Sequence, residues 1–193
     1  MRSYNRYEEA VRAKDYAQLS KTIDTKSLAE YYIISEFSNN PDAYDSSIYF
    51  YKDGADDILH IGPIWDYDFA FANHNWDKNA GEDIYSPYLV NPQTDKLYNG
   101  ENIKEFYMLI EMPEFIQEVK NVFKEKLSGK KAEFMSYVEG RANLVKEEAE
   151  KDLAIWNSPS AIRDDNDIMS NDTVYLLDWL ERKYDLMEYT YGK

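Results

Sequence analysis

Two short runs of β-branched and aromatic residues constrain the fold of this chain more than any other feature. The first run covers 47–52 (SIYFYK) and the second covers 58–64 (ILHIGPI). The segment between them, Asp53-Gly54-Ala55-Asp56-Asp57, consists largely of residue types that favour tight turns. Two strand-type runs on either side of such a turn predict an antiparallel β-hairpin.

Helix-like sequence lies on both sides of this hairpin. In the helix predicted over 25–38, Asp24 or Thr25 can form the cap, and Pro41 must end the helix, because the residue before a proline disfavours helical geometry. Apolar residues favour helices in six segments: 4–22, 25–38, 101–111, 113–127, 131–156 and one capped by Asp172. No period is visible from 66 to about 100. The chain is therefore predicted to be one α+β domain, residues 1–193, that is mostly helical.

The helix predicted over 25–38 is expected to bury a broad apolar face. This face consists of Leu28, Tyr32 and Phe37, with Ile33 and Ile34 beside them.

The charge and composition exclude several classes of protein. The chain carries 22 Lys and Arg residues against 37 Asp and Glu residues, a formal net charge of −15. Such a charge repels nucleic acids and anionic membrane surfaces at long range. The absence of cysteine excludes disulfides, thiolate nucleophiles and cysteine-ligated metals. No apolar run is long enough to span a bilayer, and the start of the chain lacks the apolar stretch of a signal peptide.

Three of the acidic residues differ from the rest in their surroundings. Most acids are solvated surface groups, and Asp53, Asp56 and Asp57 are interpreted as turn residues. Asp42, however, lies on the loop between a helix end and the first strand. Asp66 and Asp68 follow the second strand within 62–71 (GPIWDYDFAF), among aromatic and apolar neighbours. Acids in such surroundings are costly to bury unless they are hydrogen-bonded, paired or bound to a metal.

The hairpin should bring Asp42 and Asp66 to the same rim, because a hairpin places its two outer ends side by side. Carboxylates gathered there would suit Mg²⁺ or Mn²⁺, which prefer oxygen ligands. Protein kinases have the same order of loop Asp, hairpin and second Asp, with an Asn metal ligand five residues after the first. Ser47 occupies that position here and is a weaker ligand. The same spacing also fits structural roles, with Asp42 as a cap and Asp66 and Asp68 as hydrogen-bonded loop residues.

Three segments resemble the CotH family, which is named for spore coat protein H and comprises atypical protein-kinase-like enzymes. They are 35–42 (SEFSNNPD), 46–53 (SSIYFYKD) and 61–71 (IGPIWDYDFAF), of which GPIWDYD is the most specific. The resemblance extends more loosely to Trp179-Leu180-Glu181-Arg182. It implies a fold like the C-terminal lobe of a kinase. It also implies that Asp42 is the catalytic acid and Asp66 the metal ligand, with Asp68 and Ser47 as further ligands.

The resemblance further implies phosphoryl transfer from ATP to Ser or Thr hydroxyls of a protein substrate, dependent on Mg²⁺ or Mn²⁺. The chain is expected to be the C-terminal part of a CotH-like domain, because no nucleotide-binding half precedes Met1. The isolated chain is accordingly expected to be inactive. For the parent protein, an extracellular or cell-surface location is favoured, with the spore coat as the alternative.

Other interpretations stay open. The chain could be a non-catalytic scaffold built on a degenerate kinase-like fold, at a cell surface or in a cellulosome, that binds a protein or glycan. A metal-dependent hydrolase could use the same acids, although no nucleophile can be named. His60 is interpreted as a satisfied core or edge histidine, and a substrate or metal role for His74 is not favoured. Tyrosines at helical spacing are interpreted as core lining rather than a sugar-binding surface: Tyr31, Tyr32 and Tyr184.

Overall fold

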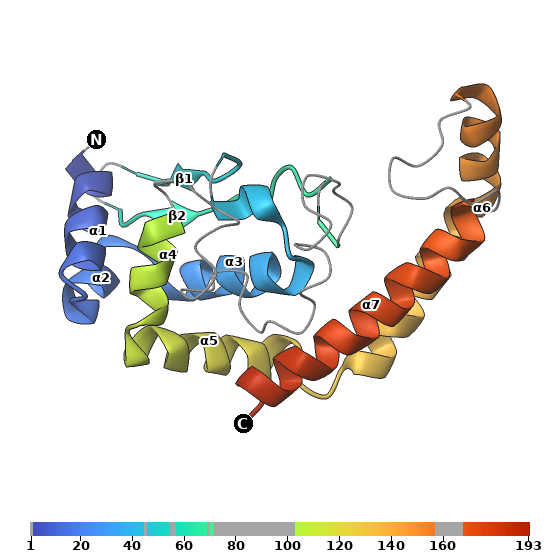
Figure 1. Ribbon diagram of the computed structural model, residues 1–193. Coiled ribbons are helices and arrows are strands. Elements are labelled where there is room, and N and C mark those ends of the chain that lie inside the picture. The colour runs from blue at the N-terminus through green and yellow to red at the C-terminus, as the bar shows by residue number, and fades with distance from the viewer. Residues whose placement is uncertain (1, 45, 55–56, 69, 72–102, 157–167) are drawn as a thin grey trace.

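The computed structural model describes residues 2–44, 46–54, 57–68, 70–71, 103–156 and 168–193 (Figure 1). Over these ranges the chain is mostly helical and contains one small antiparallel sheet, so the predicted α+β class is confirmed. Among the described residues, none of the helices combines the length and the hydropathy that crossing a bilayer requires. The elements are α1 (Arg2–Arg12), α2 (Tyr16–Thr22), α3 (Thr25–Ser38), the 3-10 helix η1 (Pro41–Tyr44), β1 (Phe50–Tyr51), β2 (His60–Ile61), α4 (Ile103–Ile110), α5 (Pro113–Lys126), α6 (Lys131–Trp156) and α7 (Ile168–Tyr191).

The first predicted helix, 4–22, is two helices in the structure. The break follows Arg12, and Lys14 adopts a left-handed backbone conformation with φ of 51°. The Asp15 side chain then accepts a hydrogen bond of 3.0 Å from the backbone N–H of Gln18 and caps α2. The amphipathic pattern continues across the break, so apolar spacing alone did not reveal it.

Helix α3 lies at the centre of the molecule and packs against α5, α7 and β2. It begins as predicted, with the Asp24 carboxylate accepting from the N–H groups of Lys26 and Ser27. Its predicted face is largely buried, with one exception, because Ile34 is 41% exposed. The helix ends at Asn39, whose φ of 48° is the left-handed conformation common after a helix C-terminus.

The hairpin is present but shorter than predicted. Phe50 pairs with Ile61 and Tyr51 with His60. The ladder ends at Gly62, whose φ of +129° suits glycine alone, and Pro63 has no N–H to donate. A separate parallel bridge between Ile23 and Leu59 attaches the turn side of the hairpin to the connection between α2 and α3.

The C-terminal helices extend the fold in one direction. Figure 1 shows α6 and α7 as a long antiparallel pair whose far end leaves the body of the molecule. Helix α7 begins at Ile168, so Asp172 lies inside the helix and its prediction as the cap was wrong. The C-terminal half of α7 packs on the core through five buried hydrophobic residues: Trp179, Leu180, Tyr184, Met187 and Tyr191.

Tyr31, Tyr32 and Tyr184 are buried in the core, as predicted. The hydroxyls of Tyr31 and Tyr44 fix the segment that follows α3. Tyr31 donates a hydrogen bond of 2.7 Å to the backbone oxygen of Ala43. Tyr44 donates one of 2.8 Å to the carboxylate of Glu36, which is fully buried. Burial and the charge of Glu36 raise the pKa of Tyr44 well above its usual value, so it stays a donor. These contacts hold η1 against α3.

A buried acid at the contact of α1 with α4 makes stability depend on pH. Glu105 is 9% exposed and accepts a hydrogen bond of 3.4 Å from the Tyr4 hydroxyl. Burial, followed by the charge of Glu8, raises the pKa of Glu105 from 4.5 to about 7. The unfolded chain releases this proton more readily, so stability falls as the pH rises from about 4.5 to 7.

We therefore expect Glu105→Gln, which mimics the protonated side chain, to flatten the pH profile of unfolding. In the wild type, the contribution of Glu105 to the free energy of unfolding should fall by on the order of 1–2 kcal/mol between about pH 5 and 8, because the carboxylate keeps some contact with water. The variant should lack this decrease. Urea unfolding at both pH values measures it. Glu114→Gln, at an exposed position of α5, is the matched control and should behave as the wild type. Parallel profiles for Glu105→Gln and the wild type would contradict the assignment.

Candidate functional site

One buried side chain contacts both of the acids expected at the rim of the hairpin. Asn40 is fully buried and directly follows the end of α3. Its Nδ2 donates a hydrogen bond of 3.2 Å to the backbone oxygen of Asp66. Its Oδ1 accepts one of 3.3 Å from the backbone N–H of Asp42. The structure therefore places the backbones of Asp42 and Asp66 on either side of the same amide group.

Ser47 makes a second connection between the same two residues. Its backbone N–H donates a hydrogen bond of 3.0 Å to the Asp42 carbonyl. Its hydroxyl, on a residue only 5% exposed, donates one of 3.3 Å to Oδ2 of Asp66. The position at which kinases carry a metal-binding Asn is thus occupied by a group that contacts the Asp66 carboxylate directly.

The backbone of Asp66 adopts an uncommon conformation. Its φ of 62° lies in the left-handed region, which aspartate tolerates better than most residues. The Asn40 and Ser47 hydrogen bonds hold it there, while the residue itself stays exposed to solvent. Backbone strain of this kind clusters at functional sites, so the conformation adds weight to Asp66 as a site residue.

Asp68 is set apart from this pair by Tyr67. Asp68 is exposed, whereas the Tyr67 hydroxyl shares a hydrogen bond of 3.0 Å with Ser35 of α3. In the part of the chain that the structure describes, Asp42, Asp66 and Asp68 do not form a group with ligand atoms within 4.8 Å of one another. Among the described residues, the backbones of Asp42 and Asp66 therefore lie close together at the rim, but the three carboxylates do not meet at one point.

The rim nevertheless has oxygen ligands of the kind that Mg²⁺ and Mn²⁺ prefer. The Asp66 carboxylate and the Ser47 hydroxyl are both oxygen ligands, and they already lie within hydrogen-bond distance of each other. The exposed Asp66 carboxylate is open to an ion from solution. The residues present therefore fit a hard divalent cation.

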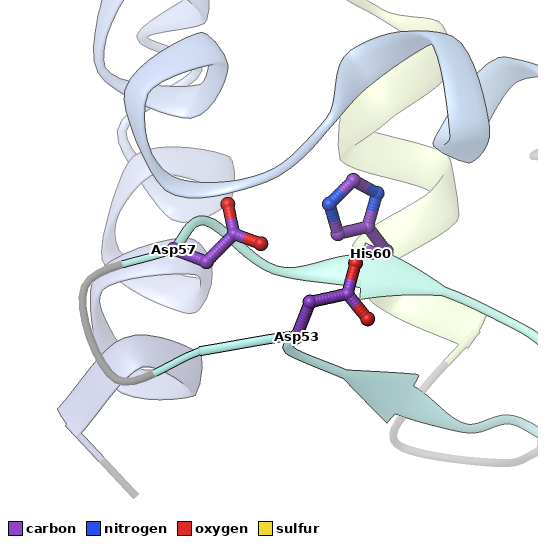
Figure 2. Close-up of side chains that lie close together, drawn as sticks. All are labelled: Asp53, Asp57 and His60. Atoms are coloured by element: carbon purple, nitrogen blue, oxygen red, sulfur yellow. The ribbon is translucent and has the colours of Figure 1, made fainter.

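A different group of possible ligands lies at the opposite, turn end of the hairpin. Figure 2 shows Asp53 and Asp57 on the two arms of the turn and His60 on β2. One ligand atom of each of these residues lies within 4.8 Å of those of the other two. The residue types of this segment predict turn roles for both acids and do not by themselves reveal this juxtaposition. The spacing Asp-x3-Asp-x2-His across a hairpin turn was the signal that could have found it.

His60 itself has partners in the protein. Its Nδ1 lies 3.3 Å from Oδ2 of Asp24, and its ring stacks on Tyr51 with 5.2 Å between centroids. The Asp57 carboxylate accepts a hydrogen bond of 2.8 Å from the N–H of Ile58. These contacts agree with the interpretation of His60 as a satisfied edge histidine. His74 lies outside the described residues.

Helix α7 contributes a residue to the support of the rim. Lys183 is fully buried, and its Nζ donates a hydrogen bond of 2.7 Å to Oδ1 of Asn39. Asn39 immediately precedes the Asn40 that contacts both acids. The two partners are 144 residues apart in the chain, and no local pattern in the sequence indicated this pairing.

The comparison with known families agrees with the geometry. The family model described as CotH kinase protein matches residues 3–187. The chain belongs to this family. Searches of curated proteins and of solved structures found no match. Membership of the CotH kinase family indicates a kinase-like function, and the match includes the rim residues and most of α7.

We expect Asn40→Ala to lower the stability of the fold by about 1–3 kcal/mol, because the N–H of Asp42 and the carbonyl of Asp66 lose their buried partner. Urea unfolding measures the loss. Asn121→Ala, on the exposed face of α5, should change stability by less than about 0.5 kcal/mol. Equal effects of the two substitutions would show that Asn40 does not hold the rim.

Proposed function

We propose that this chain supplies the catalytic and metal-binding acids for phosphoryl transfer from ATP to Ser or Thr hydroxyls of a protein substrate. The observation that carries the proposal is the contact of Asn40 with both Asp42 and Asp66. It gives the loop acid and the acid after the hairpin a common support, in the order used by kinase catalytic segments. Membership of the CotH kinase family supports the same reaction class.

Each residue has a distinct role in this proposal. Asp42, partly buried on η1, positions the acceptor hydroxyl and receives its proton. The exposed carboxylate of Asp66 binds Mg²⁺ or Mn²⁺, with the Ser47 hydroxyl and Asp68 as further oxygen ligands. When bound, the metal neutralises charge on the ATP phosphates. As part of the proposal, residues 1–193 act as one domain, the C-terminal part of a CotH-like kinase domain.

A second candidate is a non-catalytic binding module built on the same fold. Two observations favour it: Ser47 stands where kinases use Asn, and the three rim acids do not share a common point among the described residues. The protein in that case keeps the Asn40 support for structural reasons and binds a partner without turnover. Phosphate incorporation distinguishes the two candidates.

We expect Asp66→Asn to lower phosphate incorporation from radiolabelled ATP by roughly 100-fold or more, since removing a group that stabilises transition-state charge has an effect of this size. The assay uses the full-length natural protein with Mg²⁺ or Mn²⁺. Asp53→Asn, at the other end of the hairpin, is the control and should keep wild-type activity. Retained activity in Asp66→Asn would refute the assignment of this residue.

We also expect Mg²⁺ or Mn²⁺ to raise the melting temperature, because a ligand that binds only the folded state stabilises it by mass action. At a metal concentration 100 times the dissociation constant the gain is about 2.7 kcal/mol. The shift should vanish in the double variant Asp66→Asn, Asp68→Asn. It should persist in Asp53→Asn, Asp57→Asn, which removes the acids at the turn. The reverse result would place the metal at the turn and not at the rim.

A further inference from the structure

A pocket of about 340 Å³ lies at the turn end of the hairpin, away from the rim. It is formed by α1, the end of α2 and the two arms of the turn, which lie together at the N-terminal end of the molecule (Figure 1). Four basic side chains and two hydroxyl side chains line it: Arg2, Arg6, Lys21, Lys52, Ser3 and Thr22. Asp57 is the one acidic residue among the described residues that line this pocket.

This concentration of positive charge is opposite to the character of the chain, in which acids outnumber bases by 37 to 22. Several lysines elsewhere form ion pairs, such as Lys26 with Glu125 and Lys131 with Asp185. Within the described ranges, by contrast, the side chains of Arg2, Arg6 and Lys21 have no hydrogen bond or ion pair. Four cations that face one cavity with a single acid among its described lining create a local positive potential there.

A hydroxyl side chain on α1 also lines the pocket. Ser3 lies on the same helix as Arg2 and Arg6. The Ser3 hydroxyl accepts a hydrogen bond of 3.3 Å from Nζ of Lys52, which brings the hairpin arm against the start of α1. The Ser3 hydroxyl and the basic side chains therefore line the same cavity.

The chemistry of the lining favours one class of ligand. Guanidinium groups match the oxygens of a phosphate in a two-point geometry, and hydroxyls can donate further hydrogen bonds. The volume is in the range of small-molecule sites and is too small for a folded partner or a nucleic-acid duplex. Ile58 is the one apolar residue that the described lining contains, so nothing there selects an apolar or aromatic ligand body.

We propose that this pocket binds a phosphate monoester, carried by a small polar molecule or by a phosphorylated side chain. Arg2 and Arg6, one turn apart on α1, bind the phosphate oxygens, and Lys21 and Lys52 neutralise the remaining charge. Asp57 opposes binding, because its carboxylate contributes negative charge to the same cavity. The site is separate from the rim and does not depend on the proposed kinase activity.

Calorimetric titration of the 193-residue chain with O-phosphoserine tests the proposal. Serine is the comparison that lacks the phosphate, and EDTA is present to exclude metal-mediated binding. The double variant Arg2→Gln, Arg6→Gln should weaken binding at least about tenfold, as expected for the loss of charge-assisted hydrogen bonds. Asp57→Asn should strengthen it severalfold. Arg12→Gln, on the same helix but outside the pocket and paired with Glu8, should leave it within about twofold. Circular dichroism confirms that the variants fold.

The source of the phosphate is tested by repeating the titration with a short peptide that contains phosphoserine. Equal affinity of the peptide and the free amino acid indicates a small-molecule ligand, and tighter binding of the peptide indicates a phosphorylated chain. Both results support the proposal that the pocket binds a phosphate monoester. Wild-type protein that binds neither probe, or equal losses in the Arg2→Gln, Arg6→Gln variant and in Arg12→Gln, would overturn the proposal. Because the titration contains no ATP, failure here leaves the proposed kinase function unaffected.

Discussion

The candidate catalytic rim depends on the need of a buried amide for hydrogen-bond partners. Asn40 is fully buried, and a buried amide without partners costs about 1–3 kcal/mol. It finds them in the backbones of Asp42 and Asp66, which come from different sides of the hairpin. Its neighbour Asn39 is in turn held by Lys183 of α7. Two adjacent asparagines thus join the end of α3, the exit of the hairpin and the last helix of the fold.

The tyrosine-rich core explains how η1, which follows Asn40, is held in place. Tyr31 reaches the backbone of Ala43, and Tyr44 reaches the buried carboxylate of Glu36, so the residues directly after Asp42 are fixed by hydrogen bonds as well as by packing. Each ring buries a large apolar surface while its hydroxyl satisfies a polar group that water cannot reach. The backbone of Asp42 therefore lies next to residues that are fixed by hydrogen bonds, as its proposed role in positioning a hydroxyl requires.

Local signals in the sequence were sufficient where neighbouring residues determine the structure. The Asp24 cap, the helix end before Pro41 and the antiparallel pairing of 50–51 with 60–61 are of this kind. The start of α7 and the exposure of Ile34 were not predicted, because helix packing decides them. The Lys183 contact and the basic pocket also escaped prediction, since each joins residues from elements that only the tertiary fold brings together.

Helix α3 sets the distance between the two ends of the hairpin. At its N-terminus, Asp24 caps the helix, donates its N–H to the carbonyl of Leu59 and lies against His60. At its C-terminus, Asn40 binds Asp66. The strands themselves pair over only two residues each, too few to hold a sheet alone. The 14-residue helix, about 21 Å long, therefore acts as the rigid element between the acidic rim at one end and the basic pocket at the other. The two proposed sites share no residue, and the ligands proposed for them carry opposite charges.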